Sequence, residues 1–257
     1  MNKAPGRLLL IPTPLDFGVR TGGAPPELQE VLPLGVIRTA AALAHWVAEN
    51  AKTARAFLKR VDAVVPLGLA LQDISIRELP RPHKGSKVAT PHDLDGLLSP
   101  ALAGHDIGLV SEAGLPAIAD PGAALVKAAH RLGLGVVALP GTSALLLALA
   151  ASGLNGQSFA FVGYLPIDEA ARAARIRELE AGSRRAAQAQ LMIETPYRNT
   201  VLLTALLANL QPATRLAVSC GLTLTGGSNR SDSVAAWRAS PATLPADMPA
   251  VFALQAA

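Results

Sequence analysis

Short apolar runs and longer helix-like stretches follow one another along most of the chain. Several runs of four to six residues have the composition of strands, and alanine- and leucine-rich stretches separate many of them. Most of these runs lack polar alternation, as strands buried on both faces do. The pattern therefore predicts parallel sheets covered by helices, an α/β fold. The predicted strands are Arg7–Ile11, Ala44–Ala48, Asp106–Val110, Gly135–Leu139, Phe159–Gly163, Gln190–Ile193, Arg215–Ser219 and Val251–Leu254.

The same pattern predicts two domains. A chain of 257 residues, 50% of them hydrophobic, can form one large or two modest cores. The stretch Ser152–Ser158, "SGLNGQS", is polar and broken by glycine between a predicted helix and the next strand. A boundary there gives domains at residues 1–153 and 154–257. A looser stretch, Pro80–Pro100, is rich in proline, glycine and charge and is predicted to be an exposed loop or insertion.

Composition narrows the class of protein. The 23 basic and 19 acidic residues give a net charge of +4 and a pI near 9.6. This charge indicates either a mild preference for anionic partners such as RNA or a basic surface that is simply solvated. The single cysteine, Cys220, excludes an internal disulfide and a cysteine-clustered zinc site. The apolar run near the first residue is too short for a signal peptide or a membrane span. We therefore expect a cytoplasmic protein.

The common signatures of nucleotide and hydrolase sites are missing. No G-x-x-x-x-G-K-[ST] or G-x-G-x-x-G sequence occurs, which argues against an NTPase or a dinucleotide enzyme. No His, Cys and acidic residues have the spacing of metal ligands, and no serine-hydrolase elbow is present. We expect no metal site.

The loops that follow the predicted strands are unusually constrained. In Val110–Gly122, "VSEAGLPAIADPG", the glycine and proline residues after the strand require a sharp turn that exposes backbone groups. Asp120 is predicted to cap the following helix, with Pro121 as its first residue. Ile11–Pro14, "IPTP", stiffens another strand end. Because ligands of parallel sheets bind at the carboxyl ends of strands, these loops predict a ligand site built from backbone.

The stretch "LPGTSA", Leu139–Ala144, follows the same plan. Gly141 is predicted to turn the chain, and Thr142 or Ser143 to cap the next helix.

Six stretches together resemble a known family. They are "LLIPTPL", "AENAKTARAFLKRV", "VSEAGLPAIADPG", "PGTSALLLALAASGL", "FVGYLP" and "IETPYR", and in order and spacing they are similar to the tetrapyrrole-methylase superfamily. Within it the chain most resembles the ribosomal-RNA small-subunit methyltransferase I type, which methylates a cytidine ribose 2′-oxygen. The resemblance runs from about Arg7 to Leu254, and the long "SEAG" loop is its specific element.

The resemblance implies two α/β domains with S-adenosylmethionine in a cleft between them, usually in a homodimer. It implies a methyltransferase that acts on RNA, and matched position by position it assigns cofactor contacts to the strand-end loops. These residues are Pro12, Pro14, Ser111, Glu112, Ala113, Gly114, Leu115, Ala119, Asp120, Pro140, Gly141, Thr142, Ser143 and Ala144 in the first half, and Cys220, Gly221, Leu222, Pro249, Ala250 and Val251 in the second. Methyl transfer from a sulfonium is an in-line displacement, so such a site works mainly by positioning.

The chain departs from the family pattern outside the cofactor loops. It has Glu49-Asn50-Ala51-Lys52 where the RNA enzymes show Glu-Asp-Thr-Arg, and Cys220-Gly221-Leu222-Thr223-Leu224 where they show Arg-Glu-Leu-Thr-Lys. Their Ser-Pro before His-Arg is Thr-Pro before Tyr197-Arg198 here. These changes leave two alternatives to an RNA methyltransferase. One is a tetrapyrrole C-methyltransferase acting on a precorrin or uroporphyrinogen, and the other is a cofactor- or RNA-binding module without activity.

Two further features have both a structural and a functional interpretation. The run "ARAFLKRV" predicts an amphipathic helix whose basic face carries Lys52, Arg55 and Lys59; this face is either simply solvated or contacts RNA phosphates. Glu194 in "IETPYR" ends a predicted strand. It either forms a structural ion pair with Arg198 or positions and deprotonates the acceptor hydroxyl as a catalytic residue.

Overall fold

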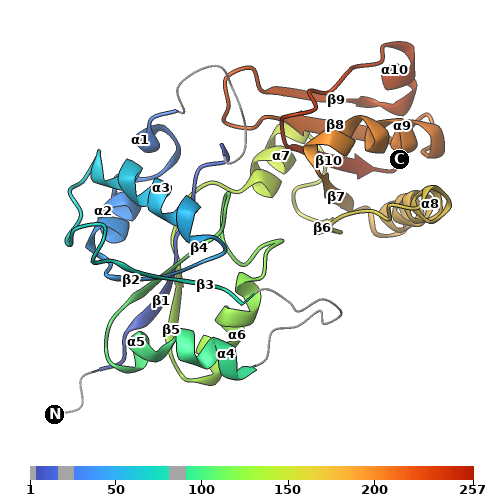
Figure 1. The fold of residues 1–257 in the computed structure, drawn as a ribbon. Helices are drawn as coiled ribbons and strands as arrows, with labels where there is room; N and C mark the ends of the chain where they lie inside the picture. Colours follow the sequence, from blue (N-terminus) through green and yellow to red (C-terminus); the bar gives the residue numbers. More distant parts are fainter. Residues whose placement is uncertain (1–3, 17–25, 81–90) are drawn as a thin grey trace. The chain divides into compact units, whose positions relative to one another are not determined.

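The computed structural model describes residues 4–16, 26–80 and 91–257, which divide into two compact units. Residues 4–16, 26–80 and 91–143 form the first unit and residues 144–257 the second (Figure 1). The elements of the first unit are β1 (Arg7–Leu10), α1 (Leu28–Val31), α2 (Leu34–Ala42), β2 (His45–Ala48), α3 (Ala51–Asp62), β3 (Ser75–Glu78), α4 (Pro91–Leu97), α5 (Ser99–Leu102), β4 (Ile107–Val110), α6 (Gly122–Arg131) and β5 (Gly135–Ala138). Those of the second are α7 (Ala144–Ser152), β6 (Phe159–Phe161), α8 (Glu169–Ala186), β7 (Ala189–Glu194), the 3-10 helix η1 (Pro196–Arg198), α9 (Asn199–Asn209), β8 (Arg215–Cys220), β9 (Ser228–Ser233), α10 (Val234–Ala239) and β10 (Ala250–Gln255).

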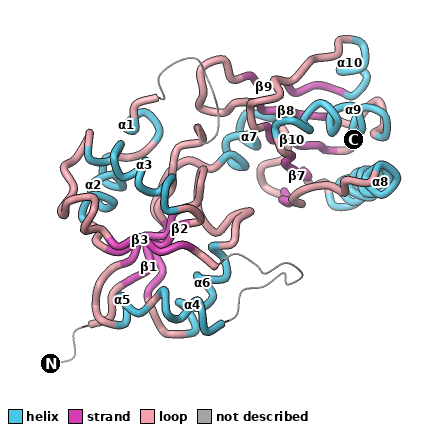
Figure 2. Tube along the Cα trace, viewed as in Figure 1, coloured by secondary structure: helices cyan, strands magenta, loops and turns pink. Residues whose placement is uncertain are grey.

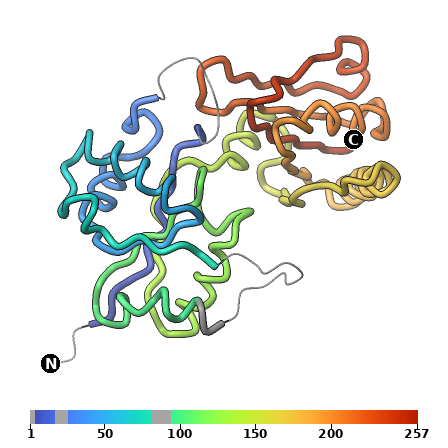
Figure 3. Tube along the Cα trace, viewed as in Figure 1, coloured from blue at the N-terminus to red at the C-terminus, as the bar shows by residue number. Residues whose placement is uncertain are grey.

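The first unit contains a parallel sheet, as the sequence predicts. Its strand order is β3-β2-β4-β1-β5, and every neighbouring pair runs parallel. The colour gradient in Figure 3 shows that β1, from the start of the chain, lies beside β4 and β5 from its middle. All carboxyl ends of these strands therefore lie at one edge of the sheet.

Helices cover both faces of the first sheet (Figure 2). Trp46 of β2 packs in a core cluster with the apolar sides of α2 and α3, whereas its neighbour Val47 packs in a second cluster with residues of α4, α5 and α6. Successive side chains of a strand point to opposite faces, so a strand covered on both sides is apolar throughout. This explains why the sequence shows no alternation in these strands.

The second sheet is mixed, which corrects the prediction of parallel sheets throughout. Its order is β6-β7-β10-β8-β9, and β6 with β7 is its parallel pair; β10 runs antiparallel to both β7 and β8, and β8 runs antiparallel to β9. The inner strands are buried almost throughout, because α7 packs on one face and α8, α9 and α10 pack on the other. Double burial removes the alternation that usually identifies antiparallel strands.

The change from one unit to the next lies at the start of α7, before the boundary expected in Ser152–Ser158. Leu149 of α7 packs against Leu191, Ala217 and Ala253 of the second sheet. The helix therefore belongs to the second unit, whereas the polar glycine turn that follows it lies within that unit. The polar, glycine-containing stretch marks where α7 ends. The packing of the side chains of α7, which shows the unit that the helix belongs to, is a stronger indicator of the boundary.

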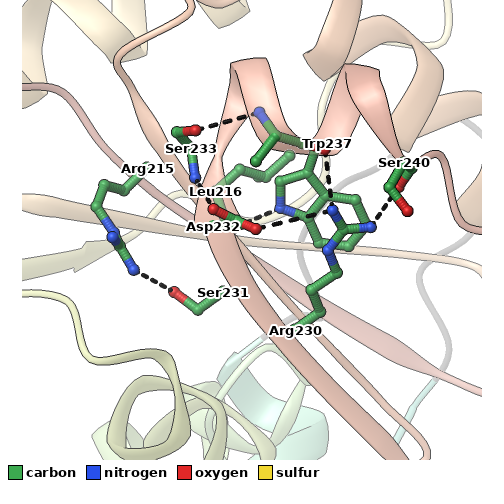
Figure 4. A network of polar contacts seen from close by, with 9 residues as sticks. Arg215, Leu216, Arg230, Ser231, Asp232, Ser233, Trp237 and Ser240 are labelled. Atoms are coloured by element: carbon green, nitrogen blue, oxygen red, sulfur yellow. Dashed lines mark hydrogen bonds and ion pairs between the residues drawn. The ribbon is translucent and has the colours of Figure 1, made fainter.

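Two strands that the sequence did not predict lie at sheet edges. They are β3, "SIRE", and β9, "SNRSDS", and both are polar and partly exposed. Figure 4 shows how β9 is held by α10: the Arg230 guanidinium lies 4.0 Å from the centre of the Trp237 ring and donates to the Ala236 and Ser240 carbonyls. Trp237 Nε1 in turn donates to the Leu216 carbonyl of β8 at 2.8 Å.

The stretch Pro80–Pro100, predicted as a loop, is partly helical. Residues 81–90 lie outside the described part of the chain, but α4 and the start of α5 occupy the rest. Leu94, Leu97 and Leu98 enter the core cluster beneath the first sheet. Tertiary burial of these leucines outweighs the proline and glycine content from which a loop was predicted.

Candidate functional site

Three loops that follow strands of the first sheet are tied together through Thr13. Its backbone forms a two-way bridge with Gly114, with N–H to carbonyl distances of 3.0 and 3.1 Å. The Thr142 hydroxyl donates to the Thr13 carbonyl at 2.6 Å. The structure thus brings "IPTP" together with "SEAG" and "PGTS", although Thr13 is 98 residues from Ser111 and 129 residues from Thr142 in the chain. Thr142 is therefore bonded across the site, and because α7 begins at Ala144, Ser143 is the residue directly before the helix.

Thr13 itself was missed from the sequence, which singled out Pro12 and Pro14 on either side of it. Its side chain is 5% exposed, and its hydroxyl lies 3.4 Å from the carbonyls of Ser111 and Gly114. A polar residue between two prolines at a strand end is a signal that could have indicated this role.

Close backbone approach explains two glycines of the site. A Cβ at Gly141 would lie 2.3 Å from Cγ of Pro12, so only glycine lets these two loops touch. Gly114 has φ of +76°, and a Cβ there would lie 3.2 Å from Leu15 and 3.5 Å from the Thr142 carbonyl. Both positions therefore need glycine for the loops to meet at this edge.

The loop after Gly114 has a strained backbone. Ala117 and Ala119 have φ of +68° and +65°, in the left-handed region that non-glycine residues rarely adopt. Asp120 holds this conformation, because its Oδ1 accepts hydrogen bonds from Ala117 N at 2.9 Å and Gly122 N at 2.7 Å. The helix α6 begins at Gly122 with Pro121 at the cap position, one residue later than predicted. Asp120 Oδ1 still accepts a hydrogen bond from the N–H of Gly122, the first residue of the helix.

Acidic side chains gather at the same edge. Glu49 Oε2 accepts a hydrogen bond from Glu112 N at 2.9 Å. Burial raises the pKa of Glu49, and the charges of Asp120 and Glu112 raise it further. Burial also raises the pKa of Asp120, whose Oδ2 is buried without a hydrogen-bond partner among the described residues. The edge is therefore suited to a cationic group or an N–H donor.

Helix α3 lies beside this edge and is capped by Asn50, whose side chain accepts a hydrogen bond from Lys52 N at 2.9 Å. The predicted apolar face is buried in the core, and the side chains of Lys52, Arg55 and Lys59 are exposed. A cavity of about 160 Å³ lies between α3 and the strand-end loops, lined among others by Thr13, Phe57 and Glu112. Arg60 also lines it and pairs with Asp16 at 2.8 Å; neither residue was singled out from the sequence.

The second set of predicted cofactor residues gathers at one edge of the second sheet. Ala250 of β10 pairs with Cys220 of β8 on one side and with Glu194 of β7 on the other. Gly221 N donates to the Pro249 carbonyl at 2.9 Å. Gly221 has φ of +63°, and a Cβ there would lie 2.9 Å from Sδ of Met248. These residues form one group within the second unit.

Glu194 makes the ion pair that the structural interpretation expects. Its side chain is 6% exposed, and Oε2 lies 3.2 Å from Arg198 Nε. Its Oε1 accepts from Thr195 N at 2.9 Å. The carboxylate is thus held in a fixed position at the end of β7, as both interpretations require.

Within the described part of the chain, no three His, Cys, Asp or Glu side chains are grouped in a way that could hold a metal ion. None of the helices among the described residues is both long and apolar enough to span a membrane.

Comparisons with known proteins identify relatives in sequence and in fold. No family model matches the chain. Ribosomal RNA small subunit methyltransferase I of Streptococcus pyogenes serotype M6 is 33% identical over 207 residues, which covers 80% of this chain and 62% of the relative. The protein of the same name from Halalkalibacterium halodurans is 44% identical over 82 residues, 32% of this chain and 28% of the relative. The chain spans less than two thirds of the length of these curated relatives.

Solved structures share the fold at low sequence identity. The methyltransferase CobJ is 16% identical with a TM-score of 0.57, covering 98% of this chain and 95% of its own. Uroporphyrin-III-C-methyltransferase from Thermus thermophilus is 18% identical with a TM-score of 0.50, covering 97% and 92%. The predicted α/β fold class is confirmed. The chain therefore has the fold of the tetrapyrrole methylases and is a divergent relative of ribosomal RNA small subunit methyltransferase I.

Proposed function

We propose that the chain is an S-adenosylmethionine-dependent methyltransferase whose acceptor is RNA, with the ribose 2′-oxygen of a ribosomal RNA cytidine as the leading candidate. The observation that carries this proposal is the group of strand-end loops joined at Thr13, Gly114 and Thr142. The names of the curated relatives support the choice of RNA. An acceptor in the ribosome would place the enzyme in the cytoplasm, and a homodimer remains part of the proposal.

The residues of the first edge fit the cofactor. S-adenosylmethionine carries a positive sulfonium and an ammonium group, and the acidic edge at Glu49, Glu112 and Asp120 complements positive charge. The positive φ of Gly114 and the close contact of Gly141 with Pro12 keep side chains away from the backbone that would contact the ligand. We propose that this edge holds the methionine part, and that backbone groups near Gly221 and Pro249 read the adenine.

The chemistry requires little of the protein beyond positioning. The bound cofactor supplies an electrophilic methyl group. The chain must hold the acceptor oxygen in line, exclude water and receive the hydroxyl proton. We propose that Glu194, fixed by Arg198 and Thr195 N, receives this proton, and that the exposed Lys52, Arg55 and Lys59 contact phosphates.

Calorimetry with S-adenosylmethionine and its demethylated product tests cofactor binding. We expect the wild-type chain to bind, and Gly114→Val to abolish detectable heat, because the new side chain fills the approach to the backbone. Gly133→Val is the matched control: Gly133 has φ of +70° with nothing within 4 Å of the added Cβ, so it carries the same backbone strain away from the site.

Two results would count against the proposal. One is folded wild-type protein that gives no heat with either compound at millimolar concentration. The other is equal loss of binding in both valine variants, which would assign the effect to strain. Labelled cofactor incubated with separate RNA and tetrapyrrole pools then identifies the acceptor, and methyl transfer to the tetrapyrrole pool alone would exclude RNA.

A further inference from the structure

Among the tryptophan, tyrosine and phenylalanine side chains that the structure describes, the two tyrosines are the most exposed. Both tryptophans, Trp46 and Trp237, are 1% exposed, and Phe252 is fully buried. The chain has two tyrosines, Tyr164 and Tyr197, and they are 59% and 74% exposed. Isolated exposed aromatic rings are common, but here both tyrosines are among the most exposed large apolar side chains. Whether this exposure has a functional role depends on where the two tyrosines lie in the fold.

Both tyrosines lie at the carboxyl ends of the parallel pair β6 and β7. Tyr164 follows Gly163, whose carbonyl accepts from Ile193 N of β7 at 3.2 Å. Tyr197 lies in η1, three residues after Glu194 at the end of β7. The charge of Glu194 and, more strongly, burial of the phenol raise the pKa of Tyr164. Both tyrosines therefore lie in the segments that follow this parallel strand pair, and Glu194 ends one of its strands.

The basic side chains of residues 144–257 are of a type that suits a nucleic acid. Every basic side chain in residues 144–257 is an arginine, and Arg198, which pairs with Glu194, directly follows Tyr197. Arginine binds phosphate bidentately and stacks on planar groups. Exposed aromatic rings beside arginines are a recurrent platform for unpaired bases, because every base has a π face, whereas a base within a duplex is not available.

We propose that Tyr164 and Tyr197 form a stacking platform that holds unpaired RNA bases beside Glu194. This inference rests on the proposed function and adds that the acceptor is read as single-stranded or looped RNA. The amphipathic phenol suits the role, since its ring offers an apolar face to a base and its hydroxyl can form a hydrogen bond. The platform would present the ribose of a stacked nucleotide to the carboxylate at the end of β7.

The test measures oligonucleotide affinity of the full chain without cofactor. Fluorescence anisotropy would compare a labelled unpaired RNA, the same strand with an abasic centre, and its duplex. We expect Tyr164→Ala with Tyr197→Ala to weaken binding of the unpaired strand by about fivefold or more per ring, and Tyr→Phe at both positions to bind within about twofold of wild type. Leu146→Ala, which removes another exposed apolar side chain of the second unit, is the matched control.

The abasic strand and the duplex should show no difference between wild type and the alanine variant. Equal affinity of both proteins for the unpaired strand would overturn the proposal. So would a loss of affinity for a uroporphyrin probe with RNA binding unchanged, which would assign the rings to a tetrapyrrole. Ile167, 78% exposed, lies three residues after Tyr164, so this surface is apolar enough to contact a second copy of the chain. Sedimentation velocity of the wild type and the alanine variant therefore measures the oligomeric state. A change of oligomeric state in the alanine variant would assign the rings to a contact between copies of the chain.

Failure of this inference is separable from failure of the proposed function. Ring-dependent binding of unpaired RNA without cofactor binding would contradict methyl transfer but support the platform. Methylation of RNA by a chain whose RNA affinity does not depend on the two tyrosines would support methyl transfer and contradict the platform.

Discussion

Glu49 is a carboxylate that the fold holds at some electrostatic cost. Burial and the nearby charges of Asp120 and Glu112 raise its pKa, while its bond to Glu112 N opposes that shift. The folded state therefore binds a proton at Glu49 more tightly than the unfolded state does. Stability from this group is present at low pH and is lost as the pH rises from the unfolded pKa through the higher folded pKa.

Glu49→Gln should remove this pH dependence. The amide oxygen can still accept from Glu112 N, and the negative charge is gone. At pH 8 we expect the variant to be as stable as wild type or more stable, by less than about 1 kcal/mol because the carboxyl is partly solvated. At pH 4 the two proteins should converge. Urea denaturation at both values measures this; Glu30→Gln, an exposed acid of the same unit, is the control. A variant that is less stable at pH 8 would contradict it.

Glu194 and Arg198 allow a comparison of two variants that break the same ion pair. Glu194→Gln and Arg198→Gln each leave one buried partner alone, so both should lower the melting temperature. If Glu194 receives the acceptor proton, its variant alone should lose about a hundred- to ten-thousand-fold in methyl transfer, with cofactor affinity unchanged. Single-turnover transfer by the folded fraction decides this, and equal rates in the two variants would leave Glu194 a purely structural role.

At the scale of elements, α3 has one apolar face buried in the core and one basic face exposed to solvent. Its apolar face fills the core, so its basic face can change without loss of packing. Glutamine has nearly the same helix propensity as lysine and arginine. Replacement of all three exposed cations by glutamine should therefore leave the fold intact and test the surface alone.

We expect Lys52→Gln, Arg55→Gln and Lys59→Gln together to weaken RNA binding and to reduce the slope of log affinity against log salt by about 2. Each phosphate contact to a single strand contributes about 0.7 to that slope. Titrations at several salt concentrations measure it. Arg38→Gln with Lys127→Gln removes exposed cations from α2 and α6 as a control. An unaltered slope in the triple variant would exclude α3 from the RNA contact.

The edge strands show where pattern reasoning stops at this scale. β9 is polar along its length, and its place in the sheet depends on pairing with β8 and on Arg230 over the Trp237 ring. Both β8 and Trp237 lie outside the strand itself. An edge strand has one neighbour and one solvated side, so its sequence carries little hydrophobic signal.

At the scale of the whole molecule, sequence and fold identify different relatives. The curated sequence relatives are named as RNA methyltransferases, whereas the solved structures of the same fold include C-methyltransferases. One fold carries many acceptors, so the choice between them depends on side chains at the sheet edges. In this chain we propose that the cations of α3 and the two tyrosines make this choice, whereas Cys220, which stands where the family pattern has an arginine, is buried in the core of the second unit. Burial and the charge of Asp247 raise the pKa of that thiol.

The sequence by itself determined the positions of the inner strands, the amphipathic face of α3 and the loops that turn at Gly114 and Gly141. These features follow from local composition and from backbone conformations that only some residues adopt. Tertiary structure alone decided the mixed direction of the second sheet, the place of α7 and the bridge from Thr13 to Gly114. Each of these features joins residues far apart in the chain, and such contacts depend on the order of the strands in the sheet. A local pattern of apolar and polar residues indicates how deeply a residue is buried, but not which residue it contacts.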